Sequence, residues 1–323
     1  MPRGGQLRHG SLQFYPRKRA DRILPSVNWN SVLETKDKPG LLGFIGYKVG
    51  MSSAYVKDNT PNSMTKGKKI IIPVTIIECP TLKIFSVRFY KNKKVVGEIL
   101  NQSLDKELKR KLKLPNEYRG KIESFKKDFD DLRVIAYTQV KKTGIKKSPD
   151  ILEIGLAGSK EEKLNFAKEN FSREISIKDF LTEDIMKNAV VDIRGVTTGK
   201  GNQGTTKRFG TNLRAHKSEK GVRGPGSGGP WHPSRVEFSQ PMPGQMGYFT
   251  RTVLNNKIIL SENISKNNIN PEQGFKHYGK IKNDFLILFG SVQGPTKRQL
   301  IITPSYRQSK PQSKKNYEFL ELR

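Results

Sequence analysis

Three glycines, Gly199, Gly201 and Gly204, follow a strand-like run at 190–194 and have the spacing of a dinucleotide-binding loop. In such a loop a helix begins at the third glycine, and its N-terminus holds the pyrophosphate of the cofactor. The residues after Gly204 are polar and basic and show no amphipathic helical period. Glu219 has nearly the spacing of a ribose-binding acid, but glycines and basic residues surround it. The motif is incomplete, and we expect no nucleotide cofactor here.

Residues that could ligate a metal or act as nucleophiles are few and scattered. The single cysteine, Cys79, lies in the apolar run 70–79 and is expected to be a buried, inert thiol. The four histidines show no spacing typical of metal ligands: His9, His216, His232 and His277. No compact segment combines a nucleophile with a base that could activate it. We therefore expect no catalytic residues, no metal site, no cofactor and no small-molecule substrate.

The charge of the chain requires an anionic partner. Its 323 residues include 60 Lys and Arg against 30 Asp and Glu, so the formal net charge is +30. The hydrophobic fraction is only 34%, so we expect part of the chain to pack against something other than protein. No apolar run is long enough to span a membrane, and the first twenty residues lack the apolar core of a secretory signal. These features predict an intracellular protein with no membrane partner.

Two segments rich in Gly and Pro concentrate this positive charge. Residues 1–22 contain six Lys and Arg and one acid, Asp21, and their glycines and prolines prevent a continuous helix. Residues 195–229 contain ten glycines and seven Lys and Arg, with Glu219 as the one acid. Glycine lets a backbone approach phosphates, and arginine can fork to phosphate or stack on a base, so both segments suit RNA. A flexible loop without a partner is the alternative, but solubility alone needs no such clustering.

The run GPGSGGPWHP at 224–233 places Trp231 and His232 between two prolines, after six residues without a large side chain. Trp231 could be a buried plug, which is the commoner environment of a tryptophan, or an exposed tip that stacks on a base. The sequence leaves both roles open. The candidate RNA-binding residues are the cationic and aromatic side chains of these segments and their surroundings: Arg3, Arg8, His9, Arg17, Lys18, Arg19, Arg22, Lys200, Lys207, Arg208, Arg214, His216, Lys217, Lys220, Arg223, Trp231, His232, Arg235 and Arg251.

Short strands must position these segments. Eight runs rich in β-branched and aromatic residues, each bounded by turn-forming residues, predict strands: Leu41–Tyr47, Ile70–Cys79, Lys83–Tyr90, Arg133–Val140, Val190–Arg194, Tyr248–Leu254, Phe285–Phe289 and Leu300–Thr303. Many short strands separated by turns indicate a barrel or a sandwich. The tail 304–315 is polar and is expected to run over the surface or onto the partner.

Two segments of mixed charge predict peripheral helices. One has Leu104, Leu108 and Leu112 on one face, and the other places Leu164, Ala167 and Phe171 after a capping box at Ser159 and Glu162. We therefore expect an α+β protein, mainly β, with a β-barrel core and a helical insert. The expected parts are an N-terminal extension at 1–35, a barrel core at 36–97, 132–158, 188–194 and 253–323, an insert at 98–131 and 159–187, and an internal extension at 195–252.

Five blocks resemble, in order, the universal large-subunit ribosomal protein three family, in its archaeal type: RHGSLQFYPRKR at 8–19, GFIGYKVGMS at 43–52, GVTTGKGNQGTTKRFG at 195–210, GPWHPSRVEFSQPMPGQMGYFTRT at 229–252 and GFKHYGKIKNDFLILFGSVQGPTKR at 274–298. A tail with Glu318 and Glu321, in place of the long basic extension of eukaryotic relatives, favours the archaeal type.

This resemblance implies a structural protein without catalytic activity that binds large-subunit ribosomal RNA in the cytoplasm, supports subunit assembly and contacts neighbouring ribosomal proteins. It implies a β-barrel with two extensions that penetrate the RNA, and the N-terminal extension, matched by Met1–Arg22, would lie alongside the internal one. The internal extension, tipped by Trp231, would reach toward the peptidyl transferase centre. Two other classes stay open as alternatives, an RNA-modifying enzyme and an RNA chaperone that acts in ribosome assembly.

Overall fold

The computed structural model describes residues 10–33, 39–115, 122, 125, 128–229, 231–232, 234–237 and 240–323. The chain divides into two compact units. Unit 1 comprises Met1–Asp21 and Val196–Thr250, and unit 2 comprises Arg22–Gly195 and Arg251–Arg323. The described residues form many strands and few, short helices, which confirms the prediction of a mainly β protein of the α+β class.

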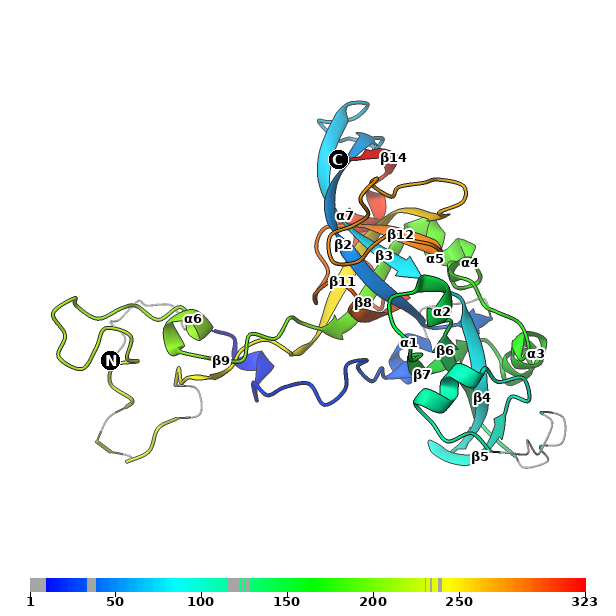
Figure 1. The fold of residues 1–323 in the computed structure, drawn as a ribbon, viewed down its shortest axis with the longest axis horizontal. Helices are drawn as coiled ribbons and strands as arrows, with labels where there is room; N and C mark the ends of the chain where they lie inside the picture. The colour runs from blue at the N-terminus through cyan, green and yellow to red at the C-terminus, as the bar shows by residue number, and fades with distance from the viewer. Residues whose placement is uncertain are drawn as a thin grey trace. The chain divides into compact units, whose positions relative to one another are not determined.

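The larger sheet has seven strands in the order β13-β8-β11-β12-β3-β2-β14. Its strands are β2 (Phe44–Asp58), β3 (Lys69–Cys79), β8 (Val190–Val196), β11 (Thr250–Asn263), β12 (Asp284–Phe289), β13 (Gln299–Pro304) and β14 (Tyr317–Leu322). β13 pairs with both β8 and β2, so the pairings of β2, β3, β12, β11, β8 and β13 form a closed ring. β14 pairs with the C-terminal part of β2, residues 54–58. β2 and β3 form a long antiparallel hairpin (Figure 1).

A second sheet of unit 2 has five strands in the order β1-β7-β6-β4-β5. They are β1 (Gly40–Leu41), β4 (Leu82–Lys91), β5 (Lys94–Leu100), β6 (Asp131–Thr138) and β7 (Ile151–Ala157). The sequence predicts strands near β4 and β6 and assigns them to the same core as β2 and β3; the structure places them in a separate sheet of the same compact unit. Pro80, between β3 and β4, cannot donate a hydrogen bond to a sheet, and the chain passes there from one sheet to the other.

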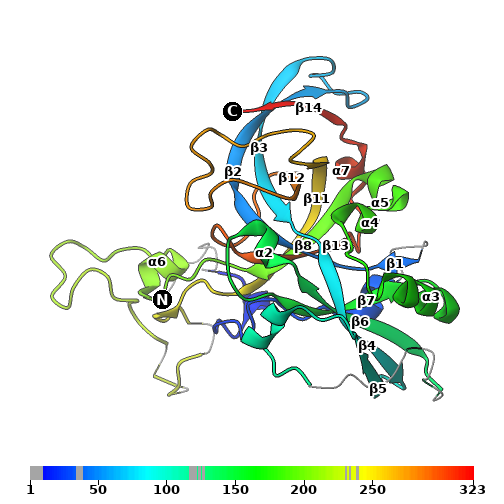
Figure 2. The same cartoon turned by 45° about the vertical axis from the view of Figure 1, so that its right-hand side comes forward.

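The helices are short, and their bounds are η1 (Leu12–Phe14), α1 (Trp29–Leu33), η2 (Lys106–Arg110), α2 (Val140–Thr143), α3 (Lys160–Asn170), α4 (Ile177–Phe180), α5 (Glu183–Asn188), α6 (Thr205–Phe209) and α7 (Lys310–Lys314). α3 begins with the predicted capping box: Ser159 Oγ accepts from the N–H of Glu162, whose carboxylate accepts from the N–H of Ser159. Ala167 is fully buried, and α3 lies beside the five-stranded sheet in Figure 2.

The helix expected around Leu104, Leu108 and Leu112 is wrong. Between β5 and β6 the described residues contain the 3₁₀ turn η2, and Ile122 also has 3₁₀ geometry; of the three leucines Leu108 alone is buried. Like charges four residues apart, such as Lys109 and Lys113, oppose a longer helix. The cations bind the neighbouring loop at 147–150 instead: Arg110 and Lys111 donate to the carbonyls of Lys147 and Pro149.

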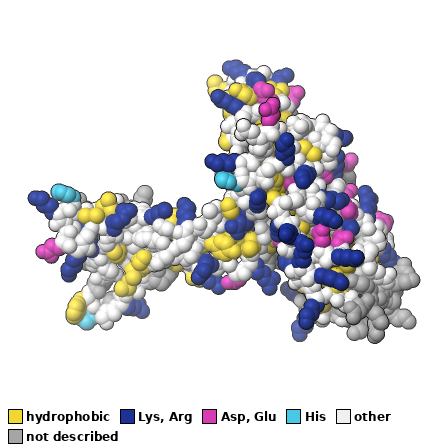
Figure 3. All heavy atoms as spheres, viewed as in Figure 1, with side chains coloured by type: hydrophobic (Ala, Val, Ile, Leu, Met, Phe, Trp, Pro, Cys, Tyr) yellow, Lys and Arg dark blue, Asp and Glu magenta, His cyan; other side chains and the backbone are white. Residues whose placement is uncertain are grey.

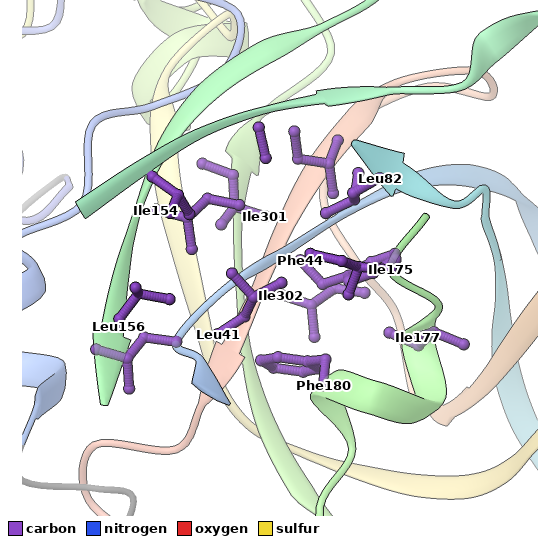
Figure 4. Packing of buried hydrophobic residues seen from close by; sticks show 14 of the residues in the cluster. Leu41, Phe44, Leu82, Ile154, Leu156, Ile175, Ile177, Phe180, Ile301 and Ile302 are labelled. Carbon is purple, nitrogen blue, oxygen red and sulfur yellow. The ribbon is translucent and has the colours of Figure 1, made fainter. Parts of the chain in front are cut away.

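The main core of unit 2 lies between the two sheets. Figure 4 shows Phe44 of β2 and Ile301 and Ile302 of β13 together with Ile154 of β7 and Phe180 of α4. Burial of each such side chain contributes roughly 1.5–3 kcal/mol, so this shared core joins the sheets into one unit. Cys79 belongs to the same core and is a free, fully buried thiol whose pKa is raised by burial, as its apolar surroundings predict.

Candidate nucleic-acid interface

Unit 1 contains most of the predicted RNA-binding residues and few acids. It holds thirteen Lys and Arg against Asp21, Glu219 and Glu237. The ion pairs of the described residues gather instead in unit 2, where Arg88, for example, pairs with both Glu98 and Glu153. Unit 1 has ten more Lys and Arg than acids, and among its described residues Lys18 pairs with Asp21 at 3.8 Å. In Figure 3 this unit shows many dark blue side chains and little magenta on the visible face.

The two ends of the internal loop form a hydrogen-bonded ribbon within unit 1, comprising residues 197–203 and 244–249. The N–H of Thr197 donates to the oxygen of Phe249 at 2.9 Å, and β9 (Asn202–Gln203) pairs antiparallel with β10 (Gly244–Gln245). At Gly247, φ is +70°, and an added Cβ would lie 2.1 Å from the oxygen of Thr198. Only glycine permits this close backbone approach. The ribbon fixes where the loop leaves and returns.

The N-terminal arm is attached to the ribbon. The N–H of Ala20 donates to the oxygen of Tyr248 at 2.8 Å. The Arg17 guanidinium carbon lies 4.4 Å from the centroid of the Phe209 ring and 5.2 Å from that of Tyr15, which are cation–π distances. The arm and the internal loop therefore contact each other directly within unit 1.

A short helix, α6, begins directly after Gly204, although the residues there show no amphipathic period. The helix has five residues and ends at Gly210, whose φ of +70° is the usual C-terminal stop. The preceding strand, β9, has two residues and pairs antiparallel with β10. A dinucleotide-binding unit needs a parallel strand followed by a long helix. The prediction that the three glycines do not form such a site agrees with this geometry.

Arg208 connects α6 to the returning end of the loop. Its Nε donates to the oxygen of Gln245 at 2.9 Å, and its Nη1 donates to the oxygen of Met242 at 2.8 Å. Burial and the nearby Arg17 guanidinium lower the pKa of Arg208. An arginine remains charged after such a change. Arg208 therefore both holds the loop and adds positive charge beside Arg17.

The environment of Trp231 distinguishes its two possible roles. Its side chain is 86% exposed, whereas the other tryptophan, Trp29, is 4% exposed in the core of unit 2. The buried-plug role is therefore excluded, and the side chain is available to stack on a partner. The adjacent His232 is also exposed.

The remaining candidates divide by exposure and by unit. Those exposed in unit 1 are Lys18, Arg19, Lys200, Lys207, Arg214, His216, Lys217, Lys220, Arg223 and Arg235. Arg17 and Arg208 are half-buried there. Arg22, exposed, and Arg251, partly buried, belong to unit 2. Arg3, Arg8 and His9 lie outside the described residues.

Sequence reasoning missed the aromatic and glycine residues that support the arginines. Phe209 and Tyr15 stack on Arg17, and Gly10 lies so close that an added Cβ would be 2.4 Å from Arg17 Nη2 and 3.1 Å from Phe209 Cδ1. The signal was present in the adjacent basic and aromatic residues of FYPRKR and KRF. A contact between residues 192 positions apart leaves no periodic trace, so the pairing itself was not predictable.

The described residues also bear on metal-ligating clusters and membrane-spanning helices. Among the described residues, no group of three or more His, Cys, Asp or Glu could hold a metal ion. No helix in the described part of the chain combines the length and apolar character needed to cross a membrane.

Comparison with known proteins places the chain in a family. A family model described as "Ribosomal protein L3" matches residues 1–322. A "Large ribosomal subunit protein uL3" of Methanocaldococcus jannaschii is 41% identical over 318 residues, covering 94% of this chain and 92% of the relative. Proteins of the same name from Methanobrevibacter smithii and Picrophilus torridus are 40% and 38% identical, covering 95% and 94% of this chain and 94% and 92% of the relatives. The chain therefore belongs to the ribosomal protein L3 family, a family of ribosomal proteins and not of enzymes, as the sequence blocks predict.

Proposed function

We propose that the chain is a structural component of the archaeal large ribosomal subunit in the cytoplasm, and that it binds large-subunit ribosomal RNA through unit 1. The observation that carries this proposal is the distribution of charge. Unit 1 presents nine exposed Lys and Arg side chains among the candidates, with three acids in its whole sequence. RNA phosphates would supply the missing negative charge, and they dominate the affinity of most RNA-binding proteins. The relatives are named as large-subunit proteins, which supports this location.

Unit 2 would act as the globular anchor. The closed ring of strand pairings supports the expected barrel, and ion pairs within unit 2 balance many of its own charges. Its exposed surfaces would contact other parts of the RNA and neighbouring ribosomal proteins, and would help to hold the subunit together during assembly.

The internal loop would carry a second role. Its exposed Trp231 would stack on an unpaired base, since aromatic side chains provide sequence-tolerant stacking for single-stranded RNA. Its resemblance to the family's internal extension suggests that this base lies near the peptidyl transferase centre.

Co-sedimentation tests the proposal against the chaperone alternative. The tagged full-length protein, expressed in a related archaeon, should sediment with large subunits and stay there through a high-salt wash. Release by that wash, or sedimentation with assembly intermediates alone, would favour a transient chaperone. An RNA-modifying enzyme would leave subunits lacking a specific nucleotide modification when the protein is depleted, a result that the structural role does not predict.

A further inference from the structure

Two arginines, one from each of the two segments of unit 1, lie beside one aromatic ring. The guanidinium carbon of Arg17 is 4.4 Å from the centroid of Phe209, and that of Arg208 is 5.1 Å from the same centroid. The backbone of Gly10, with φ of +80°, closes on this cluster. The ring and the glycine therefore hold two planar cations close together.

No acid balances these two charges. Asp21, the acid of the arm, lies 3.8 Å from Lys18, and neither Arg17 nor Arg208 has an ion pair among the described residues. Two neighbouring cations repel each other, and a ring provides only part of the compensation. Elsewhere in the protein paired arginines do meet acids: Arg88 and Arg133 share Glu153. The cluster in unit 1 is an arginine pair of the same kind without its anion.

Some donors of the two guanidinium groups have no acceptor among the described residues. The Nε of Arg17 is buried without an acceptor, and its Nη2 makes one long bond, 3.4 Å, to the oxygen of Ser11. Unsatisfied buried donors are rare in folded proteins, so an external acceptor is expected. Arg208 uses Nε and Nη1 on carbonyls, which fixes the guanidinium and leaves Nη2 available. Both arginine side chains are partly exposed, so an external acceptor can reach the cluster.

We propose that Arg17 and Arg208 together bind one phosphodiester group of the RNA backbone. This inference rests on the RNA-binding function proposed above. A phosphodiester has two non-bridging oxygens and one negative charge, and guanidinium groups recognise such oxygens through paired N–H donors. One phosphate would neutralise both arginines and would connect the N-terminal arm to the internal loop. It would thereby make the two segments bind RNA as one element.

A double-mutant cycle tests the pairing. The affinity of the full-length protein for large-subunit ribosomal RNA is measured for Arg17→Gln, Arg208→Gln and the double variant. Because one phosphate needs both arginines, each single change is expected to weaken binding about tenfold, and the double change hardly more. The exposed neighbours Lys18 and Lys207 provide the matched pair, whose losses should multiply. If the losses at Arg17 and Arg208 also multiply, the shared site is wrong while RNA binding by unit 1 stands.

Ethylation interference identifies the ligand. In the wild-type complex, ethylation of one phosphate should block binding, and that interference should disappear in both arginine variants. Loss of interference at different phosphates, or at none, would overturn the proposal. Arg208→Lys serves if Arg208→Gln disorders the loop, because lysine can still donate to the carbonyls of Gln245 and Met242 but lacks the fork. A wild-type protein that does not bind the RNA would overturn the proposed function itself.

Discussion

Ala20 donates its backbone N–H to the backbone oxygen of Tyr248, and this 2.8 Å hydrogen bond joins the N-terminal arm to the returning end of the internal loop. The two residues are 228 positions apart, yet their segments form one unit with its own contacts. The bond lies next to Gly247 and close in sequence to Arg17, so the arm, the ribbon and the arginine cluster belong to a single arrangement. The N-terminal arm and the internal loop therefore belong to one compact unit, the candidate RNA-binding unit.

The two tryptophans give opposite predictions. Trp231→Ala should leave the melting temperature of the free protein unchanged, because the side chain is 86% exposed. The loss of one stacking contact, worth roughly 1–3 kcal/mol, should not release the protein from the subunit, but it should change the footprint of drugs bound at the peptidyl transferase centre. Trp29→Ala is the control and should cost about 3–5 kcal/mol of stability, because it empties a core position. A large loss of stability at Trp231 with an unchanged footprint would contradict the assignment.

The salt dependence of RNA binding should follow the charges of unit 1. Replacing Lys207, Arg214, Lys217 and Lys220 by Gln should reduce the slope of log K against log salt by roughly 3, if each contacts one phosphate. Arg208 is left out because it also bonds to the carbonyls of Gln245 and Met242. The control variant changes the exposed Lys106, Lys109 and Lys113 of unit 2 and should alter the slope less. Equal effects of the two variants would place the phosphate contacts elsewhere.

Gly247 should be the least replaceable glycine of the ribbon. Gly247→Ala forces a Cβ against the oxygen of Thr198 at a φ of +70°, and the strain should exceed about 1 kcal/mol. Amide exchange at Lys200 and Met246 should accelerate, because these N–H groups are bonded across the ribbon. Gly204→Ala is the matched control, since φ there is −68° and no atom lies within 4 Å of the added Cβ. Unchanged exchange in Gly247→Ala would show that the ribbon does not form without RNA.

The rest of the loop should behave differently in the same exchange experiment. Residues 211–229 contribute few backbone hydrogen bonds, such as that from Arg214 to Val222, and contain few apolar side chains. We expect these amides to exchange rapidly in the free protein and to become protected in the subunit. Strong protection before RNA is added would contradict the expectation that this part of the loop orders on its partner.

Asp58 should make the stability of unit 2 depend on pH. Burial raises the pKa of this carboxyl, but hydrogen bonds from the N–H of Thr60 at 2.9 Å and from the hydroxyls of Ser63 and Thr65 outweigh burial and lower it overall. A lowered pKa in the folded state adds stability above the unfolded value of about 3.9, and this stability is lost as the pH falls toward the folded pKa. Asp58→Asn should therefore destabilise at pH 7, and its effect should shrink below about pH 4. An effect that does not change with pH would show that the carboxylate is not the stabilising form.

The sequence predicted local features well. All eight strand runs contain strands, and the capping box of α3 lies at the predicted residues, because each signal is contained in a few consecutive positions. The strands β5 and β7 were missed because Gly97 and Gly155 interrupt their apolar pattern. The structure explains these glycines: an added Cβ would lie 2.5 Å from Phe125 at Gly97 and 2.9 Å from Trp29 at Gly155. Each of these aromatic rings comes from a segment distant in the sequence, so the residues next to the strand do not reveal that a ring packs on it.

The tail runs largely over the surface, as expected, with residues 306–308, 310, 311 and 314 exposed. Residues 304–315 are partly held by the fold, since the N–H of Tyr306 donates to the Asp192 carboxylate, and the following residues form β14 on β2. For the candidate site, the local amino-acid composition was enough to predict which segments carry the cations of unit 1, because the charge of a segment follows from its sequence without its fold. The family resemblance implies that the two extensions lie side by side, but the particular contacts of Arg17 with Phe209 and of Ala20 with Tyr248 depend on how the chain returns, which no local pattern indicates.

Directed cleavage of the RNA tests the central claim most directly. Cys79 is buried, so Ser227→Cys introduces one accessible thiol in the exposed part of unit 1, to which an iron chelate can be tethered. Met64→Cys, at a position 96% exposed in unit 2, is the matched control. In assembled large subunits we expect the iron at residue 227 to cut large-subunit ribosomal RNA next to the peptidyl transferase centre, and the iron at residue 64 to cut elsewhere or not at all. Subunits that contain the Ser227→Cys protein but show no cleavage from it would contradict RNA binding by unit 1.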